Sequence, residues 1–153
     1  MEEVPVKVWR VGRNSDSLYL LVLQGDSEQA LPMVIGPCEA MAIWSVVQAG
    51  GEAPRRPMTH DLLRDLIARL GGRVVKVVID DLWNGVYYAK LHIAVDGEVV
   101  TVDARPSDAV AVALRTDAPL FAMDSVLAAA REPEPRDEGR GAGPEIETDL
   151  GDL

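Results

Sequence analysis

Two carboxylates, a guanidinium and a hydroxyl lie within six consecutive residues of this sequence: Asp103, Arg105, Ser107 and Asp108. The stretch that carries them, Thr101–Thr116 (TVDARPSDAVAVALRT), has the pattern of a strand that turns at Pro106 into an alanine-rich helix. Proline suits the first helical position, because the amide hydrogen that it lacks would have no partner there. Paired carboxylates can hold a divalent cation or transfer protons, and an arginine beside them can bind a phosphate. This corner is the densest cluster of potential chemistry in the chain.

The same corner also has a structural interpretation. Asp108 falls in the first turn of the predicted helix, where a carboxylate faces the positive end of the helix dipole. Arg105 could form an ion pair with Asp103 that does no more than hold the corner together. Structural ion-pair networks gather titratable groups in the way that active sites do. The residue types alone favour this structural interpretation, and both interpretations stay open.

A second polar cluster surrounds the start of another predicted helix. Thr59 is expected to be the N-cap of this helix, and Asp61 lies in its first turn. His60 could act as a general base with Asp61 orienting it, while Arg55 and Arg56 could bind a phosphate. Alternatively, Thr59 caps, Asp61 complements the helix dipole and His60 is a solvated residue.

Three further features are weaker. Asp80–Asp81 closes a predicted buried strand, where carboxylates can bind Mg²⁺ but are also ordinary turn residues. Trp83, Tyr87 and Tyr88 surround a hairpin, where aromatic rings can stack on bases but more often pack across strands. His92 lies in mid-strand between apolar neighbours, which is typical of a packed or surface histidine.

The absence of other motifs narrows the chemistry. The sequence has no phosphate-binding glycine loop, dinucleotide fingerprint, nucleophile elbow or zinc-ligand spacing. Its single cysteine, Cys38, excludes an internal disulfide and suits a reducing compartment. No apolar run of about 18 residues and no signal-peptide pattern appear, so we expect a cytoplasmic protein.

The charge is unevenly distributed along the 153 residues, whose formal net charge is −10. Eight acidic residues and two arginines give the segment 132–153 a charge of −6, which leaves −4 for residues 1–131. We therefore predict one domain at 1–131, followed by an acidic disordered tail at 132–153. Overall acidity argues against strong electrostatic binding of polyphosphate, although a domain near −4 can still carry a local basic patch.

Hydrophobic periodicity and turn signals predict alternating strands and helices. We expect strands near 4–12, 18–24, 30–35, 74–79, 86–95, 98–102 and 120–122, and helices near 38–48, 59–70, 106–116 and 123–131. Asn84-Gly85 is a strong type I′ hairpin signal, and Asp96-Gly97 is a second tight turn.

An internal similarity relates two parts of the chain. Residues 34–43 (VIGPCEAMAI) resemble 102–112, and their helix starts match at a constant offset of 69, so that Glu39 corresponds to Asp108. Both copies follow a hairpin and have a proline near the helix start. The sequence therefore predicts a duplicated strand–strand–helix unit around a pseudo-twofold axis. Only the second copy adds the aspartate, arginine and serine of the corner, so an active site should favour that copy.

These motifs resemble the bifunctional nuclease family of small bacterial and plant domains credited with both DNase and RNase activity. The resemblance is carried by RPMTHDLL (56–63) and VDARPSDAVAVALRTDAP (102–119), with VIGPCEAMAI and VVIDDLWNGVYYAKL (77–91) in matching order. It covers about Val4 to Leu127. The hairpin at 82–86 is less polar than is usual in this family, and the acidic tail replaces the C-terminal extension of some relatives.

The resemblance implies an α+β domain with a mixed, largely antiparallel sheet, flanking helices and self-association into a homo-oligomer. It also implies a nuclease acting on RNA or DNA. The polar residues inside the family motifs are the candidate site: His60, Asp61, Asp103 and Asp108 as catalytic residues, and Arg56, Arg105 and Ser107 as substrate-binding residues.

Two functions remain in competition. In the first, Asp103 and Asp108, with Asp61 or Asp80, hold Mg²⁺ or Mn²⁺ for phosphodiester hydrolysis, while the arginines bind phosphate and His60 moves protons. In the second, the same corner belongs to a non-catalytic module that binds a regulatory ligand or partner. Geometry separates them, because a single site fails if His60 lies more than roughly 10 Å from the two carboxylates.

Overall fold

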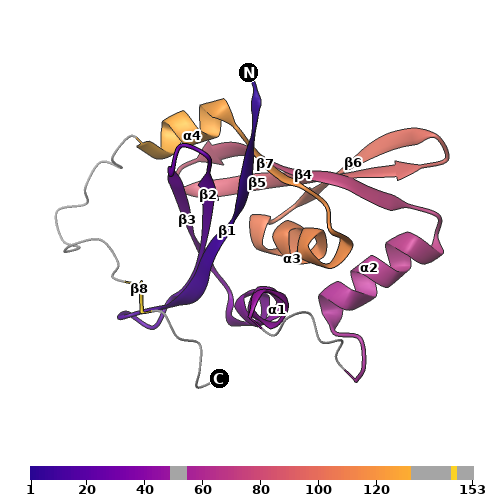
Figure 1. The fold of residues 1–153 in the computed structure, drawn as a ribbon, viewed down its shortest axis with the longest axis horizontal. Coiled ribbons are helices and arrows are strands. Elements are labelled where there is room, and N and C mark those ends of the chain that lie inside the picture. The colour runs from indigo at the N-terminus through magenta and orange to yellow at the C-terminus, as the bar shows by residue number, and fades with distance from the viewer. Residues whose placement is uncertain (49–54, 132–145, 148–153) are drawn as a thin grey trace.

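A computed structural model describes residues 1–48, 55–131 and 146–147 as one sheet with four helices (Figure 1). The strands are β1 (Glu3–Asn14), β2 (Tyr19–Gly25), β3 (Ala30–Ile35), β4 (Arg73–Trp83), β5 (Val86–Val95), β6 (Glu98–Ala104), β7 (Leu120–Met123) and β8 (Ile146–Glu147). The helices are α1 (Pro37–Val47), α2 (Thr59–Arg69), α3 (Pro106–Thr116) and α4 (Asp124–Arg131). The predicted helix stop at Gly50-Gly51 and nearly all of the predicted tail lie outside the described residues.

The strands follow the order β3-β2-β1-β7-β4-β5-β6, and β8 pairs with β1. Among the described strands β4 and β7 form the one parallel pair, so the predicted mixed and largely antiparallel α+β sheet is confirmed. Each half of the sheet is a three-stranded meander followed by a helix, β1–β2–β3–α1 and β4–β5–β6–α3, with β7 between the halves. The two helices begin at Pro37 and Pro106, which preserves the offset of 69 seen in the sequence.

Two tight turns set the register of the second meander. Asn84 and Gly85 have φ values of 49° and 74°, and Asp96 and Gly97 have 51° and 77°. Both turns are those predicted, since these residue types tolerate positive φ. The second turn places Val95 opposite Glu98, and β5 and β6 then stay in register as far as the pair Ala89 and Ala104.

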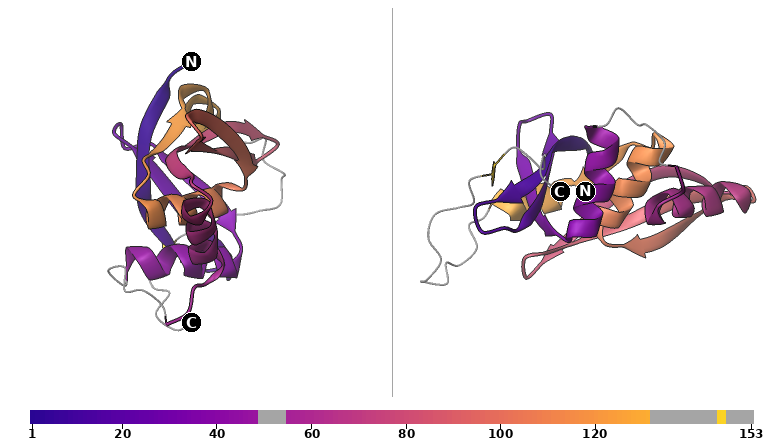
Figure 2. Two further views of the ribbon diagram at one scale, coloured as in Figure 1. Left: turned by 90° about the vertical axis from the view of Figure 1, so that its right-hand side faces the viewer. Right: turned by 90° about the horizontal axis from the view of Figure 1, so that it is seen from below.

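Helix α3 is the centre of the helical layer. Its residues Ala109–Ala113 are buried, and their small side chains let it pack closely against β4 and β5. Helices α1 and α2 both pack against α3, and the view from below in Figure 2 shows α1 and α3 side by side. Helix α4 packs on β4 and β7, away from the other three helices in Figure 1. None of the helices in the described ranges is long and apolar enough to cross a membrane.

Helix α2 differs from its prediction in two respects. Its N-cap is Met58 rather than Thr59, because the Asp61 carboxylate reaches back and accepts a hydrogen bond from the Met58 N–H at 2.9 Å. Thr59 is consequently the first helical residue. The helical spacing of the apolar residues predicts one apolar face on this helix, but its four leucines remain 39–78% exposed and only Ile67 of that face is partly buried (the leucines are Leu62, Leu63, Leu66 and Leu70).

Candidate functional site

The shortest contact between the two polar clusters joins His60 to Asp108. His60 Nε2 lies 2.9 Å from Asp108 Oδ1, although 48 residues separate them in the sequence. Helix α2 supplies the histidine from its first turn, and α3 supplies the aspartate from its own first turn. The ring is buried, with 7% of the residue exposed, so the packing of α2 against α3 holds its orientation.

Arg105 completes this cluster from the N-cap position of α3. Its Nε and Nη2 atoms both lie 2.9 Å from Asp108 Oδ2, and Nη2 also donates to Glu39 Oε1 at 2.7 Å. The hydrogen bond to Asp108, and then the one to Glu39, raise the pKa of Arg105 above its ordinary value. The corresponding carboxylates of the two halves thus share one arginine.

The first half has no second arginine at the matching position, which is Gly36. A Cβ there would clash with Glu39 Oε2, because the Glu39 side chain folds back over the start of α1. The glycine therefore leaves room for the carboxylate that binds Arg105. The prediction that Arg105 pairs with Asp103 is wrong in this structure, since its partners are Asp108 and Glu39.

His60, Asp108, Arg105 and Glu39 line a cavity of about 960 Å³ between α1, α2 and the start of α3, which we call the first cavity. Its remaining wall is largely apolar, with side chains such as Met41, Val46, Met58 and Leu63. This volume lies at the upper end of the range for small-molecule pockets, and a few convergent polar groups in an apolar pocket are typical of a ligand site.

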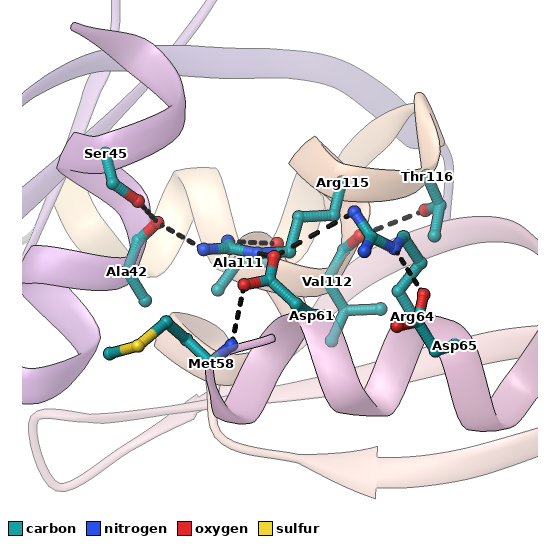
Figure 3. A network of polar contacts seen from close by, with 10 residues as sticks. All are labelled: Ala42, Ser45, Met58, Asp61, Arg64, Asp65, Ala111, Val112, Arg115 and Thr116. Carbon is teal, nitrogen blue, oxygen red and sulfur yellow. Dashed lines mark hydrogen bonds and ion pairs between the residues drawn. The ribbon is translucent and has the colours of Figure 1, made fainter. Parts of the chain in front are cut away.

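Asp61, the neighbour of His60, belongs to a different network (Figure 3). Arg115 Nε donates to Asp61 Oδ1 at 2.7 Å, and its other nitrogens donate to the carbonyl oxygens of Ala111 and Ala42. One guanidinium therefore joins α1, α2 and α3. Burial alone would raise the pKa of Asp61, but the hydrogen bonds from Met58 and Arg115 outweigh it and hold that pKa below its ordinary 3.8.

Asp103 lies on β6 and belongs to a third group of charged side chains, together with Lys90 and Asp80. Lys90 Nζ is 3.3 Å from Asp103 Oδ1 and 3.2 Å from Asp80 Oδ2. The bond to Asp80 is the main cause that raises the pKa of Lys90, and Asp103 adds to it against the opposing effect of burial. Asp103 is not among the residues that line the first cavity.

The two remaining predicted residues lie apart from the His60–Asp108 pair. Arg56 is exposed in the segment before α2. Ser107 is buried in the first turn of α3 and lines a second cavity rather than the first. The structure thus brings together three of the seven predicted residues: His60, Arg105 and Asp108.

The predicted metal ligands, Asp103 and Asp108, do not fit a cation site in this arrangement. Both oxygens of Asp108 are bound, one by His60 and the other by Arg105. The Lys90 ammonium already lies between Asp80 and Asp103, where a cation would have to sit. Within the described ranges, no three His, Cys, Asp or Glu side chains are grouped so as to hold a metal ion.

With this geometry established, the chain can be compared with known proteins. A family model described as "Bifunctional nuclease domain" matches residues 20–135, about three quarters of the chain. The chain belongs to the bifunctional nuclease domain family. The match includes every residue of the His60–Asp108–Arg105 cluster and both helices that position it.

Similar proteins of this family come from bacteria and plants. "Uncharacterized protein MT1877" and "Uncharacterized protein Rv1829", from two strains of Mycobacterium tuberculosis, are each 42% identical over 130 residues, which cover 85% of this chain and 76% of theirs. "Bifunctional nuclease 1" of Oryza sativa subsp. indica is 26% identical over 104 residues, which cover 66% of this chain. Those residues are 31% of the rice protein, so this bifunctional nuclease domain corresponds to less than a third of it.

Reasoning from the sequence missed two residues of the polar networks at the candidate site, Arg115 and Glu39. Arg115 lies seven residues after Asp108, two helical turns along the same face, and this spacing could have indicated it. Glu39 was recognised as the counterpart of Asp108 but not as a partner of Arg105. The offset of 69 was the available signal, because a pseudo-twofold axis brings equivalent helix starts close together.

Proposed function

We propose that this chain hydrolyses phosphodiester bonds of nucleic acid in the first cavity, with His60 as general base and Arg105 as phosphate ligand. One observation carries the proposal. His60 and Arg105 bind opposite oxygens of Asp108 at 2.9 Å, and all three side chains line one large cavity. A base, a carboxylate that orients it and a cation for the phosphate are the groups that this reaction needs.

The hydrogen bond to Asp108 determines which ring nitrogen of His60 can accept a proton. A neutral imidazole whose Nε2–H donates to Asp108 carries its lone pair on Nδ1. His60 Nδ1 makes no hydrogen bond to the residues that the structure describes, so it is available to accept a proton. The negative charge of Asp108 then stabilises the imidazolium that results.

The proton balance of the reaction follows from this arrangement. The oxygen of water bonds to phosphorus as one of its protons passes to His60 Nδ1. The bond from phosphorus to the leaving oxygen breaks, and that oxygen takes a proton from the imidazolium or from solvent. Arg105 is suited to the phosphate because a guanidinium donates two parallel hydrogen bonds to phosphate oxygens.

Arg105 can exchange partners for a substrate because its side chain is 67% exposed. An exposed ion pair is worth at most about 1 kcal/mol, so releasing Glu39 costs little. Asp61 takes a positioning role in this proposal, since both of its oxygens are bound within the helical layer. Asp103 takes no catalytic role, because it is paired with Lys90 and lies outside the first cavity.

No step of the proposal passes through a metal ion, although the sequence suggested Mg²⁺ or Mn²⁺ at Asp103 and Asp108. A cleavage assay with and without divalent metal ions distinguishes the two mechanisms. Purified protein is incubated with end-labelled RNA and DNA in Mg²⁺, in Mn²⁺ and in EDTA. Cleavage that persists in EDTA supports a site built from protein groups alone, and cleavage lost in EDTA restores the metal hypothesis.

The decisive variant is His60→Gln, and the chain offers His92→Gln as its matched control. His92 lies in mid-strand on β5 and lines neither cavity. We expect His60→Gln to slow cleavage by about 10²- to 10⁴-fold and His92→Gln to leave the rate unchanged. Equal rates in the two folded variants would overturn the assignment of the base. No cleavage under any condition would favour the alternative of a binding module that uses Arg105 to hold an anionic ligand.

A further inference from the structure

A second cavity adjoins the first at Arg105. It has a volume of about 700 Å³ and lies between β3, the β4–β5 hairpin, the start of α3 and the end of α4. Its wall includes Met33, Leu82, Val86 and Tyr87, so it is largely apolar with one aromatic ring. Arg105 is the residue that lines both cavities.

The boundary between the cavities is built from two helix starts. Pro37–Glu39 and Asp108 face the first cavity, whereas Gly36 and Arg105–Ser107 face the second. Both helices lack a side-chain hydrogen bond at the N-cap. The positive ends of two helix dipoles, with a guanidinium between them, favour an anion at this boundary.

Ser107 gives the second cavity a polar group of its own. The residue is 94% buried, since 6% of it is exposed, and it lines the second cavity. Its hydroxyl makes no hydrogen bond to the described part of the chain. The hydroxyl oxygen keeps some accessible surface, so a ligand in the second cavity can reach it and hydrogen-bond to it.

We propose that the second cavity is a nucleoside subsite, so that the protein binds nucleosides on both sides of the phosphate held at Arg105. This inference rests on the proposed function. A phosphodiester joins two nucleosides, and a largely apolar cavity with a few polar groups on each side of a phosphate site matches a base and a sugar.

The binding test compares two exposed strand valines. Val86→Asp places a carboxylate at the second cavity, and Val99→Asp places one on β6, away from both cavities. The probes are a dinucleotide with a charged methylene-phosphonate linkage, and dimethyl phosphate, which has the diester but no nucleosides. We expect Val86→Asp to weaken dinucleotide binding about tenfold more than Val99→Asp does, with equal effects on dimethyl phosphate. Equal dinucleotide affinities of the two variants would overturn the subsite.

Cleavage rates separate this inference from the proposed function. The inference predicts that Val86→Asp cleaves RNA and DNA more slowly than Val99→Asp. Cleavage at equal rates by the two variants would leave hydrolysis standing and remove the subsite. Conversely, no cleavage of any strand together with the predicted loss of dinucleotide affinity would keep the subsite and overturn hydrolysis.

Discussion

Arg105 and Arg115 stand at opposite ends of α3 and bind the same kinds of partner, yet their surroundings differ. Arg105 reaches Asp108 and Glu39 from the N-cap position, with 67% of its side chain exposed. Arg115 reaches Asp61 and two carbonyl oxygens from the last turn, with 4% exposed. Burial, rather than residue type, therefore separates a guanidinium that can change partners from one that cannot.

The difference has an energetic origin. Water competes for an exposed guanidinium, so each of its ion pairs contributes little and can be replaced by a phosphate. A buried guanidinium has left water altogether, and removing its partner leaves an uncompensated charge. Arg115 thus holds the helical layer in which His60 sits, and Arg105 faces the two cavities.

The largest expected effect is that of Arg115→Ala on stability. The substitution leaves Asp61 buried without its main cation, so we expect a loss of about 3–5 kcal/mol in the free energy of unfolding. Urea denaturation measures it. Arg64→Ala is the control, because Arg64 is 39% exposed, bonds mainly to the half-exposed Asp65 and lies 3.9 Å from Asp61, so its removal should cost about 1 kcal/mol or less. Equal losses in the two variants would break the contrast between the two arginines.

Arg105→Gln should show the reverse behaviour. Its unfolding free energy should stay within about 1 kcal/mol of wild type, since the guanidinium that is lost is 67% exposed. Dimethyl phosphate binding, followed by NMR titration, should weaken about ten- to hundredfold, because hydrogen bonds to a charged group are lost. An unchanged affinity would show that the phosphate binds elsewhere.

The pH dependence of stability tests the ion pair between Asp61 and Arg115. Its pKa lies below the ordinary 3.8, so its ion pair stabilises the fold fully above that pH and progressively less as the pH falls through it. The difference in stability between wild type and Asp61→Asn should therefore shrink from about pH 6 to about pH 3. Urea unfolding across this range tests it, and a constant difference would contradict the role given to the Asp61–Arg115 pair.

Asp103→Asn should have the smallest effect. Asp103 is 76% exposed and forms one long ion pair with Lys90, so the substitution should change the unfolding free energy by less than about 1 kcal/mol. Urea denaturation against wild type measures it. A loss as large as that of Arg115→Ala would mean that charge on the open sheet surface matters as much as charge in the helical layer.

Much of the fold could be predicted because its signals are local. Asn84-Gly85 and Asp96-Gly97 specify tight turns, and the second turn alone implies that Lys90 lies opposite Asp103. Pro37 and Pro106 mark both helix starts. The exposure of the α2 leucines was not predictable in this way, since periodicity shows that a helix has an apolar face but not what covers it.

The sequence indicated which residues form the candidate site, but not which of their side chains contact one another. His60 and Asp61 are adjacent, and neighbours on a helix point about 100° apart, so they serve different networks. Which of them meets Asp108 depends on how α2 packs against α3, a tertiary contact that no spacing encodes. The link between Arg105 and Glu39 depends in the same way on the packing of α1 against α3.

The most direct test of the account is the cleavage rate of Asp108→Asn beside Asp103→Asn, with RNA and DNA substrates and folded, purified proteins. The two aspartates lie five residues apart, but only Asp108 contacts His60 and lines the first cavity. We predict that Asp108→Asn slows cleavage by about a hundredfold or more, while Asp103→Asn cleaves like wild type. Equal rates in the two variants, or a loss confined to Asp103→Asn, would contradict the His60–Asp108 site.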